Sequence, residues 1–250
     1  MRYFLIEDMD PAESRIVIRG SDAGHIIQVL RLRSGDLIVL CDGRGMTWNA
    51  RIESLTSDSV KARVLSERLS DAESPVDIIV GQSYLKDRKM DLLVRQLTEL
   101  GVSKWMPFYS ARSVPRPDRR RIASRVQRWE KISREALKQC KRGKVMAIHP
   151  PIGFQDVVAK GRDCDLKIVF WENQDATVLI GNLTAKPAPI RKIFAILGPE
   201  GGFSTNEIDT AASHGFVRVG LGPRILRAET ATVTAVSILQ YLFGDLGKSS

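Results

Sequence analysis

The chain has 250 residues, with 38 Lys and Arg against 29 Asp and Glu, which gives a formal net charge of +9. Hydrophobic residues make up 43% and charged residues 27% of the sequence, a composition that argues against the disordered and fibrous classes. The N-terminal apolar run is too short for a secretory signal, and no stretch approaches the ~20 apolar residues of a membrane helix. We therefore expect a cytoplasmic protein with no membrane partner.

The first seventy residues are dominated by short segments in which polar and apolar residues alternate or apolar runs end in turn residues. These patterns predict strands at 15–19, 37–41, 46–53 and 59–67. Ser21 and Asp22 predict the start of a short helix between the first two strands. Many short strands with close turns predict a small β-barrel.

A polar stretch at 69–75 is typical of a linker, and the sequence pattern changes after it. We therefore predict two domains, residues 1–72 and residues 73–250. In the second domain, predicted strands lie at 76–81, 104–109, 166–171, 190–197 and 216–221, with predicted helices at 87–100 and 119–140. Alternating strands and helices predict a mostly parallel α/β sheet.

The three cysteines of the chain, Cys41, Cys140 and Cys164, are far apart, and its three histidines are equally scattered. No CxxC pair is present, so the spacing supports neither a disulfide framework nor a structural zinc site. We expect reduced thiols and no metal.

A glycine-rich segment, Ile196–Ser204, follows a predicted strand and leads into a capping-box pattern that ends at Glu207. Its glycines would let the main chain turn sharply and approach a ligand closely. The segment is neither the GxGxxG fingerprint nor the GxxxxGK[ST] phosphate loop. The absence of a following lysine favours a neutral or cationic ligand contacted through main-chain groups. A tight turn with no ligand is the alternative.

A second glycine-rich segment, Val219–Ala231, also follows a strand and leads into a helix. The predicted buried face of that helix consists of Ala231, Ala235, Ile238, Leu239 and Leu242. Because glycine turns at two strand ends can form two walls of one pocket, we expect a site with Arg224, Arg227 and Glu229 at its rim. Taken singly, Glu229 could instead stabilise the first turn of its helix, and the arginines could be solvated.

Basic residues are concentrated between Lys86 and Lys144. This segment holds 18 basic and 6 acidic residues, whereas the rest of the chain holds 20 basic and 23 acidic residues. Within it, Arg121, Arg125 and Arg128 recur on one helix face. A solvated helix face is the alternative, but the acids are too few to balance the charge, so we expect contacts with the phosphates of RNA.

The two glycine segments stand in the chain as Gly198–Ser204 and Leu221–Thr230. Further motifs are His25–Arg31, Gly35-Asp36, Glu73–Pro75, Gly81-Gln82, Lys89–Asp91 and Glu99–Val102. Together, and over essentially the whole chain, these motifs resemble the bacterial small-subunit (16S) ribosomal RNA uracil-N3 methyltransferases of the SPOUT, or α/β-knot, superfamily.

The resemblance implies a PUA-like β-barrel followed by an α/β trefoil-knot methyltransferase domain, in a homodimer that acts on 16S ribosomal RNA or the 30S subunit. It also implies S-adenosyl-L-methionine as cofactor. The residues expected to bind the cofactor are Leu197, Gly198, Pro199, Glu200, Gly201, Gly202, Leu221, Gly222, Arg224, Ile225, Leu226 and Arg227. The residues expected to contact RNA are Arg31, Arg33, Arg112, Arg116, Arg119, Arg120, Arg121, Arg125, Gln139 and Arg142.

The implied reaction methylates N3 of a specific uridine, and the N3–H must be lost before the nitrogen can attack. As catalytic residues we expect Arg227, which would stabilise negative charge on the uracil carbonyls, and Glu229, which would act as base or orienter. Ala111 and Lys138 stand where the family usually has acids, so any role of those acids is not carried over. Two alternatives are methylation of a ribose 2′-oxygen or another base position, and a non-catalytic RNA-binding protein; the intact glycine motifs argue against the latter.

Overall fold

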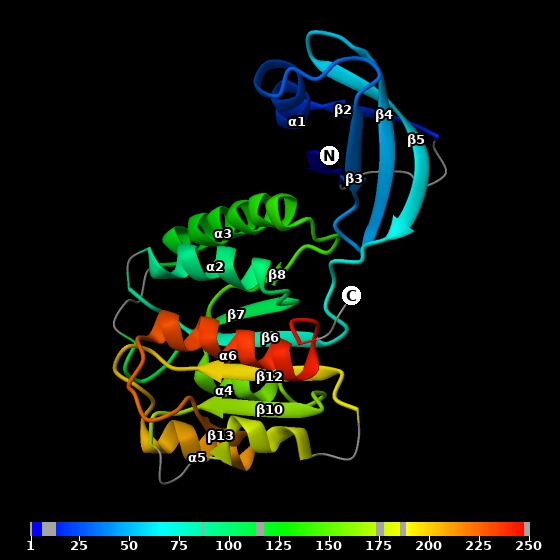
Figure 1. Cartoon of the computed structure of the whole chain (residues 1–250). Helices are drawn as coiled ribbons and strands as arrows, with labels where there is room; N and C mark the ends of the chain where they lie inside the picture. Colours follow the sequence, from blue (N-terminus) through cyan, green and yellow to red (C-terminus); the bar gives the residue numbers. More distant parts are fainter. Residues whose placement is uncertain are drawn as a thin grey trace. The chain divides into compact units, whose positions relative to one another are not determined.

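The computed structural model describes residues 2–6, 14–86, 88–113, 118–173, 178–185 and 189–247. The chain forms two compact units, which we call the first unit (Met1–Glu73 with Leu137–Val145) and the second unit (Ser74–Ala136 with Met146–Ser250). Figure 1 shows the elements of each unit. Within the described ranges, no helix is both long and apolar enough to cross a membrane.

The first unit is built on a five-stranded sheet in the order β1-β3-β4-β5-β2, so that β1 and β2 form its edges. Its strands are β1 (Arg2–Leu5), β2 (Arg15–Arg19), β3 (Leu37–Cys41), β4 (Met46–Leu55) and β5 (Ser59–Leu69). β1 pairs with β3 in parallel, and the remaining pairs are antiparallel. All four strands predicted here are present, and β1 is an addition. The predicted helix is divided into α1 (Gly20–Gly24) and a π-helical turn, η1 (His25–Val29).

Strand β2 and parts of β4 and β5 alternate between a buried and a more exposed face, whereas β3 is buried on both sides after its first residue. Alternate residues of β2, β4 and β5 enter one hydrophobic core, which also takes in side chains of α1 and η1. Ile18, Trp48 and Ile52 are among its fully buried members. The opposite face of the sheet carries arginine and lysine, as expected for an antiparallel sheet that is solvated on one side.

The second unit is an eight-stranded parallel sheet in the order β11-β13-β10-β12-β6-β7-β8, with β9 also paired to β7. Its strands are β6 (Asp77–Ser83), β7 (Lys104–Tyr109), β8 (Ala147–Ile148), β9 (Ile152–Gly153), β10 (Leu166–Phe170), β11 (Val178–Leu179), β12 (Lys192–Leu197) and β13 (Val217–Gly220). Its helices are α2 (Lys89–Glu99), α3 (Arg119–Cys140, which ends in the first unit), α4 (Phe154–Ala159), the 3-10 helix η3 (Ile180–Ala185), α5 (Thr205–Ser213) and α6 (Ala228–Phe243). The predicted parallel α/β sheet is confirmed.

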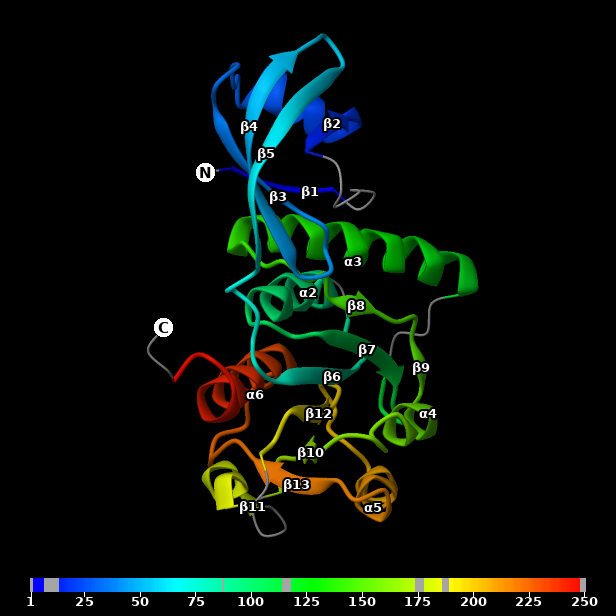
Figure 2. The ribbon, with the colours of Figure 1, turned by 90° about the vertical axis from the view of Figure 1, so that its right-hand side faces the viewer.

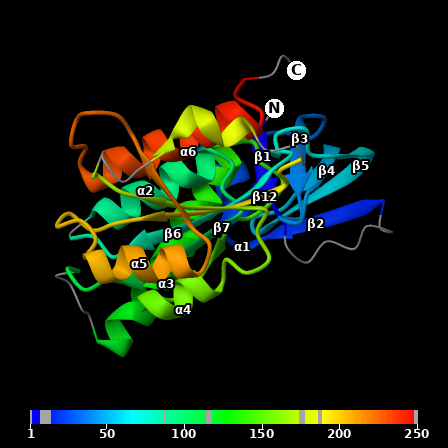
Figure 3. The ribbon, with the colours of Figure 1, turned by 90° about the horizontal axis from the view of Figure 1, so that it is seen from below.

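Helices cover both faces of this sheet, and the strands are apolar on both sides for that reason. Ile78 and Val80 enter a core shared with α2 and α6, whereas Ile79 between them enters a second core shared with α4 and α5. Figures 2 and 3 show α6 on one face and α4 and α5 on the other. On the α6 side, Trp105 of β7 meets Trp129 of α3 edge to face, with ring centroids 5.0 Å apart.

The sequence patterns place the long elements well and the short ones poorly. The predicted bounds of α3 agree with the structure, and the other predicted strands and helices differ by at most a few residues. The buried face of α6 is rotated from the predicted stripe, because its most buried positions include the polar residues Thr232 and Gln240. Both polar side chains are hydrogen-bonded within the unit, which makes their burial tolerable.

Candidate active site

The two glycine-rich segments line one cavity of about 560 Å³. They follow β12 and β13, which lie on either side of β10, so both leave the same carboxyl-terminal edge of the parallel sheet. All residues that were expected to bind the cofactor line this cavity: Leu197, Gly198, Pro199, Glu200, Gly201, Gly202, Leu221, Gly222, Arg224, Ile225, Leu226 and Arg227. A cavity of this volume is in the usual range for a small-molecule site.

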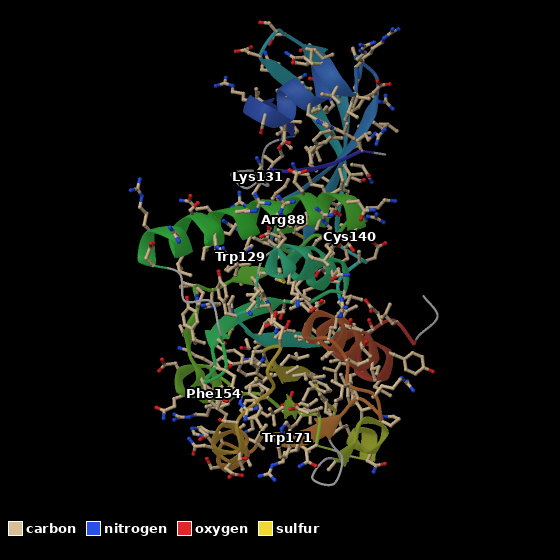
Figure 4. All side chains as sticks on the ribbon, turned by 90° about the vertical axis from the view of Figure 1, so that its left-hand side faces the viewer. Arg88, Trp129, Lys131, Cys140, Phe154 and Trp171 are labelled. Atoms are coloured by element: carbon tan, nitrogen blue, oxygen red, sulfur yellow. The ribbon has the colours of Figure 1, made fainter. Side chains whose placement is uncertain are left out.

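Eight residues outside the expected set also line the cavity, among them Trp171, Glu172 and Lys89. Trp171 and Glu172 directly follow β10, and Lys89 is the first residue of α2. Figure 4 labels Trp171, on the far side of the second unit from Trp129 of α3. Because β10 ends at the same sheet edge as β12 and β13, the rule that ligands bind beyond strand ends could have located Trp171 and Glu172.

The first glycine segment ends in a well-formed helix cap. Gly202 adopts a left-handed backbone with φ of +69°, and its N–H donates to the Pro199 carbonyl at 3.0 Å. Ser204 caps α5 through a reciprocal capping box with Glu207, as the sequence pattern predicted. The left-handed turn at Gly202 is therefore stabilised by a main-chain hydrogen bond before it and by the capped start of α5 after it.

The loop after β7 braces this same segment. The N–H of Ala111 donates to the Glu207 carboxylate at 2.8 Å, and Nη1 of Arg112 donates to the carbonyl of Gly201 at 2.9 Å. Arg112 was expected to contact RNA; its guanidinium lies on the main chain of the glycine segment. Arg112 is exposed, so a guanidinium that bonds the glycine segment is also accessible to RNA.

Gln82, at the end of β6, connects the first glycine segment with α6. Its side chain is fully buried. Its amide Nε2 donates to the carbonyls of Ser83 at 3.1 Å and of Gly198 at 3.5 Å, while its Oε1 accepts from Thr232 Oγ1 at 2.6 Å. A motif that the sequence analysis used only as a family marker thus fixes one wall of the cavity against the helix that carries the other.

Lys89 contacts carboxylates from both walls of the cavity. Its ammonium Nζ lies 3.1 Å from Glu200 Oε1, in the first glycine segment, and 3.2 Å from Glu229 Oε2, in the first turn of α6. The geometry of the second contact is not that of a hydrogen bond, and Oε2 of Glu229 is buried with no hydrogen-bond partner among the described residues. A buried acceptor of this kind is uncommon and is a candidate contact for a ligand.

The ionisation of this cluster follows from its contacts. Partial burial lowers the pKa of Lys89, but its close contacts and charge interactions with Glu200 and Glu229 outweigh burial and leave that pKa raised. Burial raises the pKa of Glu200, but hydrogen bonds from its own main chain, from Lys89 and from the N–H of Lys86 outweigh burial and leave that pKa lowered. Both groups are therefore held in their charged forms.

The two expected catalytic residues lie two positions apart at the start of α6. Arg227 is the N-cap residue, with extended backbone angles and an exposed side chain, and its carbonyl accepts from the N–H of Ala231 at 2.8 Å. Glu229 is largely buried, with 18% of its side chain exposed. Arg227 lines the cavity, whereas Glu229 is not among the lining residues and contacts Lys89, which is one of them.

The residues that were expected to contact RNA are dispersed over several elements. Arg31, Arg33 and Gln139 are exposed in the first unit, and Arg120 and Arg121 are exposed on α3. Arg116 and the side chain of Arg119 lie outside the described residues.

Three other arginines of the basic segment are engaged in contacts within a unit. Arg125 donates to the Tyr84 hydroxyl at 3.0 Å, and Arg128 pairs with Asp91 at 2.8 Å. Arg142 is 3% exposed and pairs with Glu73 at 3.0 Å. We therefore assign Arg142 to the structure of the first unit and leave it out of the RNA contacts proposed below. In the described part of the chain, no group of three His, Cys, Asp or Glu is placed to hold a metal ion.

Segments of this chain match the models of two known protein families. Residues 72–240 match a family model described as an RNA methyltransferase domain, and residues 18–65 match an RNA methyltransferase PUA domain. This chain belongs to the RNA methyltransferase family. The family resemblance inferred from the glycine motifs is confirmed, and so is the PUA-like character of the first unit.

Individual relatives agree with this assignment. Ribosomal RNA small subunit methyltransferase E of Bacillus subtilis is 30% identical over 90% of this chain and 89% of its own length. The structure of the enzyme of that name from Neisseria gonorrhoeae, bound to S-adenosyl methionine, is 31% identical with a TM-score of 0.88, covering 98% of this chain and 99% of that one. A methyltransferase of Legionella pneumophila, solved with the same cofactor, is 29% identical with a TM-score of 0.84 over 98% of both chains.

Proposed function

We propose that this RNA methyltransferase uses S-adenosyl-L-methionine to methylate N3 of one uridine in 16S ribosomal RNA. The observation that carries the proposal is that both family glycine segments line a single cavity, with Arg227 among its lining residues and Glu229 3.2 Å from Lys89, which also lines it. The Neisseria and Legionella structures contain this cofactor, and the Bacillus relative is named for the small ribosomal subunit. The protein would act in the cytoplasm, where ribosomal RNA is found.

The residues of the cavity fit this cofactor. The cofactor has no phosphate, and the glycine segments are not a phosphate loop. It carries a sulfonium and an ammonium, and two acidic residues, Glu172 and Glu200, line the cavity. The residues that we propose to hold it are Leu197–Gly202, Leu221, Gly222 and Arg224–Arg227. When bound, S-adenosyl-L-methionine supplies an electrophilic methyl group.

In the proposed mechanism, Glu229 and Arg227 make the uracil N3 able to attack the methyl group. The buried Oε2 of Glu229, which lies 3.2 Å from Lys89 Nζ, accepts the N3 proton or orients the N3–H. Arg227 stabilises the negative charge that develops on the uracil carbonyls, a task for which an exposed guanidinium at the cavity rim is suited. The two glycine segments, braced by Gln82 and Lys89, align donor and acceptor, and such alignment is a large part of the acceleration of a bimolecular step.

RNA would be held mainly through its phosphates. Each phosphate contact on a single strand makes the affinity fall by roughly 0.7 log units per log unit of salt. The residues that we propose for this role are Arg31, Arg33, Arg112, Arg116, Arg119, Arg120, Arg121, Arg125 and Gln139. An unpaired target is expected, because an N3 edge is accessible only in an unpaired base.

The proposal includes a trefoil knot in the backbone of a methyltransferase domain at residues 73–250, preceded by a PUA-like domain at 1–72, and a homodimer in solution. The strand order supports the knot, because β12 lies between β6 and β10 while β13 lies beyond β10, so the chain returns repeatedly to one region of the sheet. Sedimentation equilibrium tests the dimer, whose absence at micromolar concentration would contradict that part of the proposal.

The experiment that tests the function is methylation of undermethylated 30S subunits with labelled cofactor, followed by nucleoside mapping by mass spectrometry. We expect 3-methyluridine at one site. A ribose-methylated nucleoside would favour the alternative reaction. Calorimetry that detects no uptake of S-adenosyl-L-methionine would favour a non-catalytic RNA-binding protein. Naked 16S RNA, run in parallel, decides whether the assembled subunit is required.

A further inference from the structure

Three arginines lie side by side on the exposed face of the sheet in the first unit. The strand register places Arg15 of β2 opposite Arg63 of β5, and Arg63 opposite Arg51 of β4. Residues that are directly opposite in a sheet point to the same face. The neighbours of these arginines along each strand, such as Ile16, Ala62 and Ile52, point into the core, so the guanidinium groups project outward. We call Arg15, Arg51 and Arg63 the arginine row.

The arginine row belongs to a larger patch of positive charge. Lys61 and Arg19 are exposed on the same face. Lys61 lies two residues before Arg63 in β5, and Arg19 lies four residues after Arg15 in β2. Glu53 is the acidic residue bonded within the patch, where it accepts hydrogen bonds from Nε of both Arg15 and Arg63. Two of these five cations, Arg15 and Arg63, contact that carboxylate, so the face is locally basic although residues 1–72 as a whole hold 10 basic and 11 acidic residues.

Such an arrangement works against folding stability, because like charges directly opposite each other in a sheet repel. The side chains of Arg15 and Arg63 remain 65% and 54% exposed despite their contact with Glu53. Three forks on adjacent strands span roughly 10 Å, given a strand spacing of about 4.8 Å. Guanidinium forks bind phosphate oxygens in pairs, so a row of them is complementary to a run of phosphates.

The row is continuous with residues already expected to contact RNA. The segment that carries Arg31 and Arg33 is fastened to β4 beside the row. Ser34 Oγ donates to the carbonyl of Glu53 at 2.8 Å, and the N–H of Gly35 donates to the carbonyl of Ile52 at 2.8 Å. This tether places Arg33 near the same strand that supplies Arg51. The exposed arginines Arg31 and Arg33 therefore lie on a segment that is bonded to the strand supplying Arg51.

We propose that the arginine row, together with Lys61, Arg19 and the Arg31–Arg33 loop, is a binding surface for the phosphate backbone of RNA. This inference rests on the proposed function and adds to it a surface of the first unit that binds the phosphates of the substrate RNA. The face would bind RNA through charge and fork geometry, without reading bases.

The test is a salt titration of binding to a 16S RNA fragment, with the full-length triple variant Arg15→Gln/Arg51→Gln/Arg63→Gln. The slope of log affinity against log salt should become shallower by about 2, since three contacts of roughly 0.7 each are lost. The charge-keeping variant Arg15→Lys/Arg51→Lys/Arg63→Lys should retain most of the slope. A matched control, Lys160→Gln/Arg162→Gln/Arg191→Gln, removes three exposed cations of the second unit and should behave as the wild type.

Circular dichroism reports whether the triple variant is folded, and its cofactor affinity should be unchanged, because the cavity lies wholly in the second unit. An unchanged salt slope in a folded variant would overturn the proposal, as would a changed oligomeric state with unchanged RNA affinity, which would mark the face as a protein interface. Either result leaves methyl transfer by the wild type untouched. Failure of the wild type to methylate 30S subunits would instead contradict the proposed function.

Discussion

Lys89 and Glu229 approach each other to 3.2 Å, and the same ammonium lies 3.1 Å from Glu200. Glu200 belongs to the first glycine segment, and Glu229 to the helix that follows the second. One cation thus neutralises a carboxylate from each wall. Without it, the two carboxylates would repel each other at the place where the proposed proton acceptor has to be held still.

Replacement of Lys89 by Met should therefore lower kcat/KM for methylation by about tenfold, equivalent to about 1.4 kcal/mol. Lys89→Arg keeps the positive charge and should recover most of the activity. Steady-state kinetics, with the RNA concentration varied up to saturation, measures kcat/KM for both variants. If Lys89→Met turned over like the wild type, Lys89 would have no part in placing the two walls.

Titration of Lys89 or Glu200 should not make cofactor affinity vary with pH between about pH 6 and pH 9. The pKa of Glu200 is lowered, so its stabilising contribution is present above the ordinary glutamate pKa and is lost as pH falls through the lowered value. The pKa of Lys89 is raised, so its contribution is lost only as pH rises through the raised value. Calorimetric titration across this range checks the expectation. A midpoint near neutral pH that Glu200→Gln abolished would contradict it.

Glu229→Gln should lower kcat by about 10² to 10⁴, the usual contribution of a general base, with little change in cofactor affinity. Arg227→Ala should lower kcat by about 10² to 10³ if it stabilises charge on the uracil carbonyls. Glu200→Gln is the matched control, because it removes a carboxylate bound to the same lysine. Near-normal turnover of both Glu229→Gln and Arg227→Ala, at saturating RNA and cofactor, would exclude the proposed catalytic roles.

The glycines of the first segment should differ sharply in their tolerance of alanine. At Gly202 the backbone is left-handed, with φ of +69°, and a Cβ would collide with the carboxylate of Glu172. At Gly201 a Cβ would make ordinary contact with Arg112, at 3.5 Å. Gly202→Ala should therefore lower the free energy of unfolding by at least about 1–2 kcal/mol, the cost of the left-handed conformation alone.

Gly201→Ala should leave that free energy nearly unchanged. Gly222→Ala separates strain from collision, because Gly222 has φ of +93° with open space around its Cβ position. It should fall between the other two variants. Denaturant unfolding without cofactor measures all three, and equal losses for Gly201→Ala and Gly202→Ala would contradict the backbone argument.

The triple change Arg119→Ala/Arg120→Ala/Arg121→Ala should weaken RNA binding and reduce its salt dependence while leaving cofactor affinity unchanged. These residues open α3, and no cavity-lining residue comes from that helix. Lys160→Ala/Arg162→Ala/Arg191→Ala removes the same charge elsewhere on the second unit. Unchanged RNA affinity at moderate salt in the α3 variant would refute the assignment.

Much of the architecture follows from local patterns in the sequence. Long periodic segments such as α3 were predicted with the right bounds, since a 22-residue helix shows its apolar face many times over. The glycine turns and the Ser204 capping box were also predicted, because their conformations depend on the residue types themselves. Short elements such as β8 and β9, with two residues each, carry too little pattern to be predicted.

The sequence by itself determined the residue types that the chemistry needs: two glycine turns after strands, an acid and an arginine beside the second, and a basic segment in one part of the chain. Only the tertiary structure decided which charges remain available. It buried Arg142 against Glu73, engaged Arg128 with Asp91, and placed Lys89 between two carboxylates 29 residues apart in sequence. Strand register alone aligned Arg15, Arg63 and Arg51. These pairings join residues distant along the chain, and no local pattern records which strands or helices will be neighbours.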